Sequence, residues 1–264
     1  MEIEKEISYL REDYGYYDRN GVELQSILSC LAFRPSDTLL DIGAGIGRLS
    51  IPLSKYMMIT ALEPNRVLLD EIVDGGGVEK VHGKIQDYFP AKKFDYALIA
   101  WPQFEEEYCA IFKHLCECVL KDGGRLIVLK SRHHALRELT ASLFPAHVSK
   151  GKKFIESLPE HFEVERTEAI ETQHIYPSLD KAVELLRFEI EWFYERSISK
   201  EQKEYIFKYL KKHQSESGEV VLIAHVTLQL CRAKRHVNVQ SLDTDGGFAR
   251  MVRQGRVISQ ANAA

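Results

Sequence analysis

Short apolar runs alternate with longer segments of helical spacing through the first 130 residues of the chain. Most of the short runs are nearly continuous, as is typical of strands covered on both faces of a sheet. Residues 108–120 instead repeat apolar side chains at i, i+3, i+4 and i+7, which indicates an amphipathic helix. Strands that alternate with helices of this length predict a parallel sheet with right-handed crossovers. The elements expected are a helix at Val22–Phe33 and strands at Leu39–Ile42, Met57–Leu62, Glu79–Gly83, Phe94–Trp101 and Arg125–Leu129.

Two more strands are expected in the second half of the chain, one within Phe162–Ile175 and one at Val220–Leu230. The stretch between them, residues 177–217, is longer than a hairpin needs. Its pattern predicts two helices, one that follows the N-cap residue Ser178 and ends near Arg196, and one near Lys200–Lys212.

The first of these two helices has a wide apolar face, which predicts burial against two neighbours. We expect those neighbours to be the sheet edge and a bound substrate, and therefore interpret residues 177–217 as a lid over an active site. An insertion that enlarges the core, or a homodimer face, would produce the same pattern.

One charged residue falls within this apolar face. At about 100° per residue, Glu189 lies between Leu185 and Trp192. A buried carboxylate must find a partner or take up a proton, and such positions are often functional. We expect Glu189 to face the substrate as a polar anchor or general base. A salt bridge to an arginine, or a groove open to water, is the structural alternative.

The composition is that of an ordinary globular protein, with 45% hydrophobic and 28% charged residues. No apolar run approaches the roughly 18 residues of a transmembrane helix, and the charged start lacks the apolar core of a secretory signal. Five cysteines favour thiols in a reducing cytoplasm, and the net charge of −4 argues against a nucleic-acid surface. We expect a cytoplasmic domain over residues 1–235, and a loosely ordered tail over residues 236–264.

The motif with the most chemical content is Leu39–Gly47, which reads Leu-Leu-Asp-Ile-Gly-Ala-Gly-Ile-Gly. Glycines at alternate positions let the backbone turn sharply and approach a ligand, because no Cβ stands in the way. The helix that follows would aim its free N–H groups at that ligand. Glu63 comes after the next apolar run, where a carboxylate can accept two hydrogen bonds from a ribose diol. The layout predicts an adenosine-containing cofactor.

Spacing and charge distinguish between cofactors of this kind. Gly43, Gly45 and Gly47 give G-x-G-x-G, whereas a dinucleotide fingerprint is G-x-G-x-x-G, and Arg48 stands at its last position. Asp41 suits a cationic ligand and would be a poor neighbour for phosphates. S-adenosylmethionine carries a sulfonium and an ammonium group and no phosphate, so the balance favours it.

On these residues the chain resembles the class I S-adenosylmethionine-dependent methyltransferases, well from about Asp37 to Lys130 and more weakly to Arg232. The resemblance implies an α/β, Rossmann-like fold. Its seven-stranded sheet is mostly parallel with an antiparallel last strand, helices cover both faces, and the helical lid lies between strands 6 and 7. It also implies that the glycine loop lies along the methionine part, and that Glu63 and Asp87 hold the ribose and the adenine. The expected cofactor-binding residues are Asp41, Gly43, Ala44, Gly45, Gly47, Glu63, Pro64, Gln86, Asp87 and Trp101.

Methyl transfer requires a nucleophile held opposite the methyl group, exclusion of water, and a base only where the nucleophile keeps its proton. The candidates for such a base are Glu189, His133 and His174, and Gln103 follows the fourth strand in a substrate-facing position. A lone histidine is more often structural than catalytic. The base therefore stays unassigned.

Three further segments carry expectations. The aromatic segment Tyr14–Tyr17 is expected either to close over the cofactor or to form a surface turn. His225 lies inside an apolar strand and is expected in the core. Cys116 and Cys118 are ~200° apart around a helix and cannot share an ion, so no metal is expected.

Together these features predict a methyltransferase that acts on a small, partly apolar molecule. The fourth strand ends Ala-Trp-Pro-Gln-Phe and lacks the Asn/Asp-Pro-Pro-aromatic signature of amino-group methylation on nucleobases or glutamine. Two alternatives remain. One is a methyltransferase of protein or RNA, and the other is a non-catalytic subunit that keeps the cofactor fold to bind a partner protein.

Overall fold

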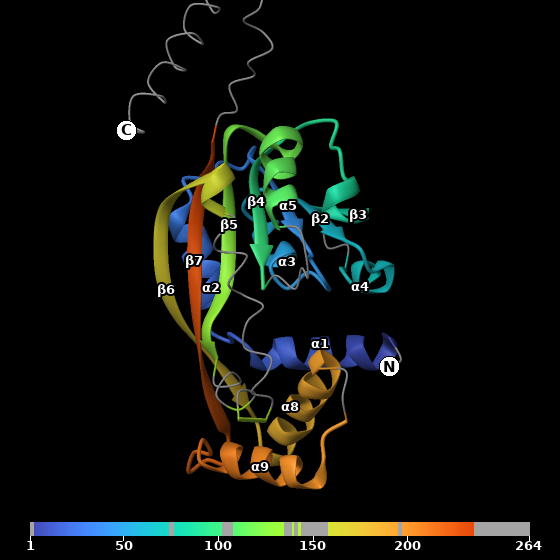
Figure 1. Cartoon of the computed structure of the whole chain (residues 1–264), viewed down its shortest axis with the longest axis vertical. Coiled ribbons are helices and arrows are strands. Elements are labelled where there is room, and N and C mark those ends of the chain that lie inside the picture. Colours follow the sequence, from blue (N-terminus) through green and yellow to red (C-terminus); the bar gives the residue numbers. More distant parts are fainter. Residues whose placement is uncertain are drawn as a thin grey trace, which may run out of the picture. The chain divides into compact units, whose positions relative to one another are not determined.

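One sheet of seven strands organises the chain, in the order β3-β2-β1-β4-β5-β7-β6 (Figure 1). The computed structural model describes residues 3–73, 77–101, 108–134, 139, 142–143, 158–194 and 197–234. The first compact unit ends at Lys234. The tail expected at residues 236–264 lies outside the described residues. The strands are β1 (Thr38–Ile42), β2 (Met58–Glu63), β3 (Val78–His82), β4 (Phe94–Ala100), β5 (Leu120–His134), β6 (Phe162–Tyr176) and β7 (Val220–Ala233).

The pairing of the strands confirms the expected topology. β1 pairs in parallel with β2 and β4, β2 with β3, and β4 with β5. β7 enters between β5 and β6 and is antiparallel to both. The chain therefore has the mostly parallel sheet with an antiparallel last strand that the sequence predicts.

Both faces of the sheet are buried, as the continuous apolar runs predict. Leu40 and Val128 point into one cluster with Phe112, whereas Leu39 and Ile127 point into the opposite one. The first face is covered by α5 (Tyr108–His114) and the π-helix η2 (Leu115–Val119), and the second by α2 (Val22–Cys30) and α3 (Ser50–Leu53).

The fifth strand is longer than the sequence predicts. We expected a helix at residues 108–120 and a strand at Arg125–Leu129, but β5 already begins at Leu120, which pairs with Phe94. Gly123 takes a positive φ of 74° inside the strand, and the register shifts between Phe94 and Tyr96. Glycine in a strand often marks such an irregularity. Residues 121–124 are therefore an irregular part of β5.

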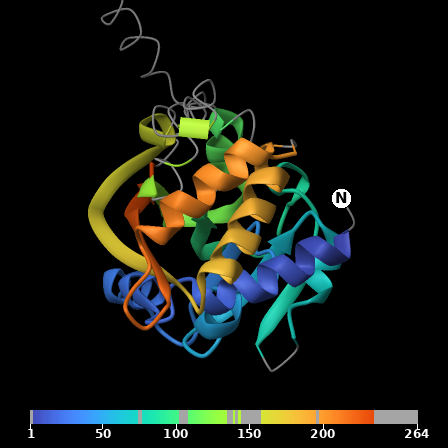
Figure 2. The same cartoon turned by 90° about the horizontal axis from the view of Figure 1, so that it is seen from below.

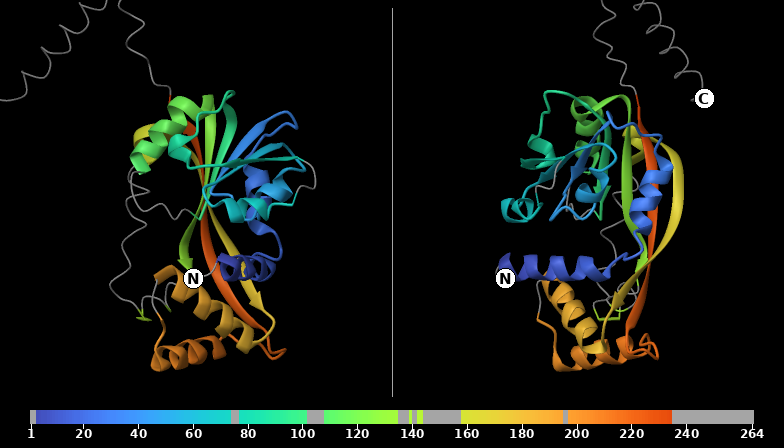
Figure 3. Two further views of the ribbon diagram at one scale, coloured as in Figure 1. Left: turned by 90° about the vertical axis from the view of Figure 1, so that its right-hand side faces the viewer. Right: turned by 180° about the vertical axis from the view of Figure 1, so that it is seen from behind.

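A third layer of helices stands at one end of the sheet and consists of α1 (Ile3–Tyr16), α8 (Leu179–Tyr194) and α9 (Lys200–Lys211). Figure 1 shows the three helices at the end towards which the arrow of β4 points, and Figures 2 and 3 show them gathered there. Their apolar side chains share one buried cluster with Tyr176, at the end of β6, and Val220, at the start of β7.

The two helices between β6 and β7 begin as predicted. The Ser178 hydroxyl accepts the Lys181 N–H at 3.2 Å, and Ser199 and Gln202 form a capping box on α9. The wide apolar face of α8 has two helical neighbours, α1 and α9, besides β6. We expected a bound substrate on that face, but α1 packs against it. The sequence analysis had not predicted this helix. No helix among the described residues is long and apolar enough to cross a bilayer.

Candidate active site

The glycine loop follows β1 and is folded against the end of β2. Gly43, Gly45 and Gly47 all have positive φ angles, of 74°, 57° and 85°. The Gly43 N–H donates to the Leu62 carbonyl at 2.8 Å, and the Gly47 N–H donates to the Ala44 carbonyl at 2.9 Å. Left-handed backbone of this kind favours glycine, which explains the alternating pattern.

The three glycines differ in what surrounds them. A Cβ on Gly47 would lie 3.0 Å from Cγ1 of Ile72, so packing requires glycine there. A Cβ on Gly43 would meet nothing within 4 Å. The backbone of Gly43 therefore borders open space, which is what close approach by a ligand needs.

Glu63 joins the loops that follow β1 and β2. Its side chain is buried, and its two carboxylate oxygens accept the N–H groups of Gly45 and Asn65, each at 2.9 Å. Charge-assisted hydrogen bonds to backbone donors are among the stronger ones in proteins. The acid and the glycine loop, sixteen residues or more apart in sequence, therefore form one unit.

Asp41 is a buried acid behind the loop. The Ser50 hydroxyl donates to its carboxylate at 2.6 Å. Burial raises the pKa of Asp41 to about 6, the Ser50 hydrogen bond and Arg48 act in the opposite direction, and Glu63 adds to the rise. A buried carboxylate with so costly a charge is a good partner for a cationic group, because the cation lowers that cost.

The N-terminal segment covers the loop. The Tyr14 hydroxyl lies 3.6 Å from the position of a Cβ on Gly45, and Ile46 packs against the buried cluster of α1 and α8. Arg11 of α1 also forms an ion pair with Glu71, which follows α4 (Arg66–Asp70). Of the two alternatives for the aromatic segment, the structure has the covering position and not the surface turn.

Arg48 also contacts the aromatic segment Tyr14–Tyr17. Its guanidinium pairs at 2.7 Å with Glu23, which is fully buried in α2 and also accepts the Tyr17 hydroxyl. The same guanidinium lies 5.0 Å from the centre of the Tyr17 ring and 5.6 Å from that of Tyr14. The sequence analysis saw Arg48 only as a departure from a dinucleotide motif and missed this role, since Glu23 gives no local signal.

Trp101 is held in an unusual backbone conformation at the end of β4. Its φ is 55°, a genuine outlier for a bulky residue. Its backbone N–H donates to the Leu129 carbonyl at 2.9 Å. Its ring packs edge to face on the Tyr17 ring, with 5.6 Å between the ring centres. Strained backbone of this kind clusters at functional sites, so the position supports the expectation for Trp101.

The remaining predicted cofactor residues follow β2 and β3. Pro64 is exposed, and its carbonyl lies 3.0 Å from Nε2 of His82. Gln86 and Asp87 are exposed on the short helix η1 (Ile85–Asp87). The Gly83 N–H donates to the Glu63 carbonyl at 3.2 Å, so the end of β3 adjoins the end of β2, as an adenine-binding position requires.

Glu189 belongs to α8, and its side chain faces α1. It is partly buried, and its carboxylate is hydrogen-bonded to the Tyr9 side chain. Burial and the nearby charge of Asp13 raise the pKa of Glu189, and the Tyr9 hydrogen bond opposes that rise. The structure thus supplies a tyrosine and a second acid as neighbours, where the sequence analysis offered an arginine as the structural alternative.

The histidines differ in how far they are buried. His174 is buried, with Nε2 3.7 Å from the Asp13 carboxylate and its ring 4.4 Å from that of Tyr17. His225 is exposed, not in the core as predicted, because β7 alternates and Ala224 and Val226 take the buried positions. The side chain of His133 and the whole of Gln103 lie outside the described residues.

No family model and no curated protein matches this sequence. Solved structures do match the fold. The protein BH2331 from Bacillus halodurans, assigned as a methyltransferase, is 15% identical with a TM-score of 0.54, over 79% of this chain and 97% of its own. A protein from Anaeromyxobacter dehalogenans, assigned as a type II methyltransferase, is 15% identical with a TM-score of 0.55, over 78% and 100%.

The fold is that of the class I S-adenosylmethionine-dependent methyltransferases. A methyltransferase fold does not by itself fix the reaction. The cyclase SpnF has the same fold at 15% identity and a TM-score of 0.50, over 81% of both chains.

The residues present fit the cofactor that this methyltransferase fold implies. Gly43 borders open space, Asp41 is a buried acid suited to a cation, and Glu63 stands beside the loop. With this cofactor bound, Gly43 would allow it to approach the backbone, Asp41 would lie near its ammonium or sulfonium charge, and Glu63 would lie near its ribose.

Proposed function

We propose that this chain binds S-adenosylmethionine and transfers its methyl group to a small, partly apolar molecule. The observation that supports the proposal most directly is the hydrogen bond between Gly45 and Glu63, with buried Asp41 behind it. A glycine turn that binds no ligand does not need two buried acids next to backbone that borders open space.

When bound, the cofactor supplies a methyl carbon that its sulfonium activates for in-line displacement. The residues of this chain then have two tasks. Asp41 and Glu63 hold and orient the cofactor, because each carboxylate meets a complementary group. Tyr14 and Trp101 exclude water from the reacting centre, since the Tyr14 hydroxyl lies against Gly45 and the Trp101 ring packs against Tyr17. The acceptor must lie opposite the methyl group.

Glu189 is our candidate for the polar contact with the acceptor. It stands in an apolar helix interface beside aromatic rings, with Tyr9 stacked on Phe188 at 4.8 Å between ring centres. Such surroundings suit a partly apolar acceptor with one polar or ionisable group. Because its pKa is raised to about 8, Glu189 is mostly protonated at pH 7, and only its ionised fraction can take the proton that a nucleophile releases.

The first experiment is calorimetry with S-adenosylhomocysteine, which should bind in a one-to-one ratio. The second incubates the chain with methyl-labelled S-adenosylmethionine and fractionated cell extract. Label in the small-molecule fraction supports the proposal, and label only in protein or RNA would establish the macromolecular alternative. Absence of cofactor binding would favour the non-catalytic subunit.

Glu189→Gln tests the acceptor contact once an acceptor is found. We expect turnover to fall by roughly tenfold to a thousandfold, as for loss of a general base, while affinity for S-adenosylhomocysteine stays unchanged. Glu184→Gln, on the exposed face of the same helix, is the matched control. Unchanged turnover in Glu189→Gln would remove Glu189 from the mechanism.

A further inference from the structure

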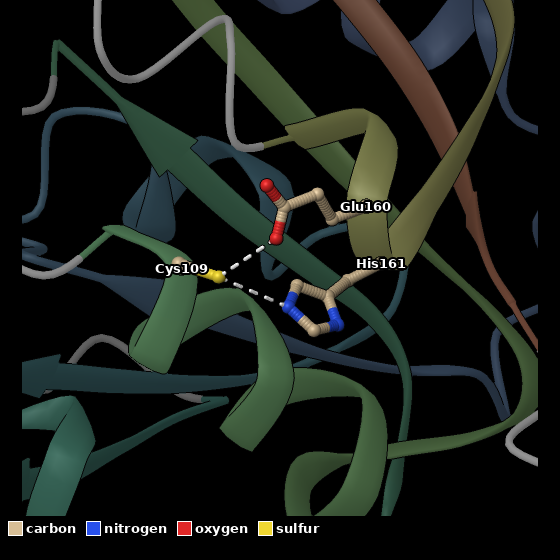
Figure 4. A group of neighbouring side chains, drawn as sticks. All are labelled: Cys109, Glu160 and His161. Carbon is tan, nitrogen blue, oxygen red and sulfur yellow. Dashed lines mark hydrogen bonds between the residues drawn. The ribbon is translucent and has the colours of Figure 1, made fainter.

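Three potential metal ligands meet away from the glycine loop. Cys109 belongs to the first turn of α5, and Glu160 and His161 to a helical turn at residues 158–161 that leads into β6. Figure 4 shows the thiol, the carboxylate and the imidazole turned towards one another. Their donor atoms all lie within 4.8 Å of one another. Cys109 and Glu160 are exposed, so an ion can reach the group from solvent.

The spacing of the donor atoms matches a tetrahedral site. Sγ of Cys109 lies 3.1 Å from Oε2 of Glu160 and 3.4 Å from Nε2 of His161. Zinc bonds of about 2.0–2.3 Å in tetrahedral geometry put neighbouring ligand atoms roughly 3.3–3.6 Å apart. Both sulfur distances are therefore within a few tenths of an ångström of those in an occupied site. Only the exposed Glu160 side chain needs to adjust.

The chemistry of the three ligands selects the kind of ion. Thiolate and imidazole are ligands for zinc and similar transition metals, whereas calcium and magnesium prefer oxygen alone. A thiolate and a carboxylate together also balance the charge of a divalent ion. We propose that Cys109, Glu160 and His161 bind one zinc ion, with water in the fourth position.

The backbone around His161 is already fixed. Its carbonyl accepts the Lys234 N–H at 3.0 Å and lies 3.4 Å from Sγ of Cys116. An ion at this site would connect the start of α5 to the turn before β6, through Cys109 and Glu160, which are 51 residues apart in sequence. β6 has 15 residues and runs roughly 45 Å along the strand from this group to Tyr176, whose hydroxyl is bonded to Asp13. None of the three ligands belongs to the proposed methyl-transfer site, so the zinc proposal does not depend on that one.

The test uses the untagged full chain and zinc alone. After equilibration with zinc and gel filtration, metal analysis should find one zinc ion per chain. Cys109→Ala and His161→Ala should each weaken zinc affinity by about a hundredfold or more, since each removes a direct ligand. Cys118→Ala removes a different cysteine and should leave the affinity unchanged.

Cobalt substitution identifies the ligands directly. A tetrahedral thiolate site gives cobalt an intense visible spectrum and a sulfur charge-transfer band. Cys109→His should retain metal but lose the charge-transfer band, whereas Cys118→Ala should keep both. The proposal is overturned if the native chain elutes without zinc, or if zinc affinity is equal in Cys109→Ala and Cys118→Ala. Melting curves without metal confirm that each variant is folded.

Discussion

The backbone N–H of Gly45 donates a hydrogen bond to the Glu63 carboxylate across 2.9 Å. This contact joins the loop after β1 to the end of β2, which lie side by side because the two strands are parallel neighbours. Glu63 also accepts the Asn65 N–H at 2.9 Å, so both of its oxygens are fixed. The acid is thus oriented before any ligand arrives, which lowers the ordering cost of binding.

Replacing Glu63 should therefore weaken cofactor binding. Glu63→Gln keeps the size of the side chain and loses the charge, and charged hydrogen bonds are worth about 1.5–3 kcal/mol each. We expect the Kd for S-adenosylhomocysteine to rise by roughly tenfold to a hundredfold, measured by calorimetry. Glu219→Gln, in the turn before β7, is the control. An unchanged Kd in Glu63→Gln would mean that Glu63 does not bind the ribose.

Gly43 and Gly123 provide a matched pair of substitutions. Both have a φ of 74°, and a Cβ at either would meet nothing within 4 Å. Gly43→Ala and Gly123→Ala should therefore lose similar stability, on the order of 1 kcal/mol from left-handed backbone. Only Gly43→Ala should also weaken S-adenosylhomocysteine binding, because its methyl group would occupy the space next to the loop. Equal affinities in the two variants would show that no ligand approaches Gly43.

The sequence predicts the parts of this molecule that depend on local pattern. The strands from Thr38 to Ala100 lie within a residue or two of their expected bounds, because buried parallel strands are short apolar runs. The contact between Gly45 and Glu63 was also foreseeable, since parallel strands end at one edge.

What the sequence does not reveal depends on contacts between distant segments. The partner of Arg48 is Glu23, on a different helix, and neither residue shows a local motif. Cys109 meets His161 only because α5 and β6 begin near one another in the fold. Helix α1 escaped notice because its sequence mixes charges with tyrosines, and its burial against α8 is a tertiary effect.

Asp41 should make stability depend on pH. Its pKa is about 6 in the folded chain and about 3.9 when unfolded. The folded state therefore holds a proton between these values that the unfolded state has released, and the free energy of unfolding should fall as pH rises from 4 to 7. The expected loss is about 3 kcal/mol at most.

Urea denaturation at several pH values measures this effect. Asp41→Asn should flatten the decline between pH 4 and 7, and Asp122→Asn, in an exposed position, should leave it unchanged. A saturating concentration of S-adenosylmethionine should also reduce the decline in the native chain, because a cationic ligand favours the ionised acid. A native profile already flat in this range would contradict the burial of an ionisable Asp41.

Arg48 should be essential for the N-terminal cover. Arg48→Met removes the partner of Glu23, a carboxylate with no exposed surface, and breaking a buried ion pair in this way costs about 3–5 kcal/mol. Arg125→Met is the control, since it breaks an ion pair with Glu165 that is partly exposed, and should cost about 1 kcal/mol or less. Adding Glu23→Gln to Arg48→Met should recover part of the loss, because the buried charge is then gone. Urea midpoints of the three variants measure these differences, and hydrogen exchange of α1 amides shows whether the cover opens first. Equal losses in Arg48→Met and Arg125→Met would mean that the pair with Glu23 does not hold the segment.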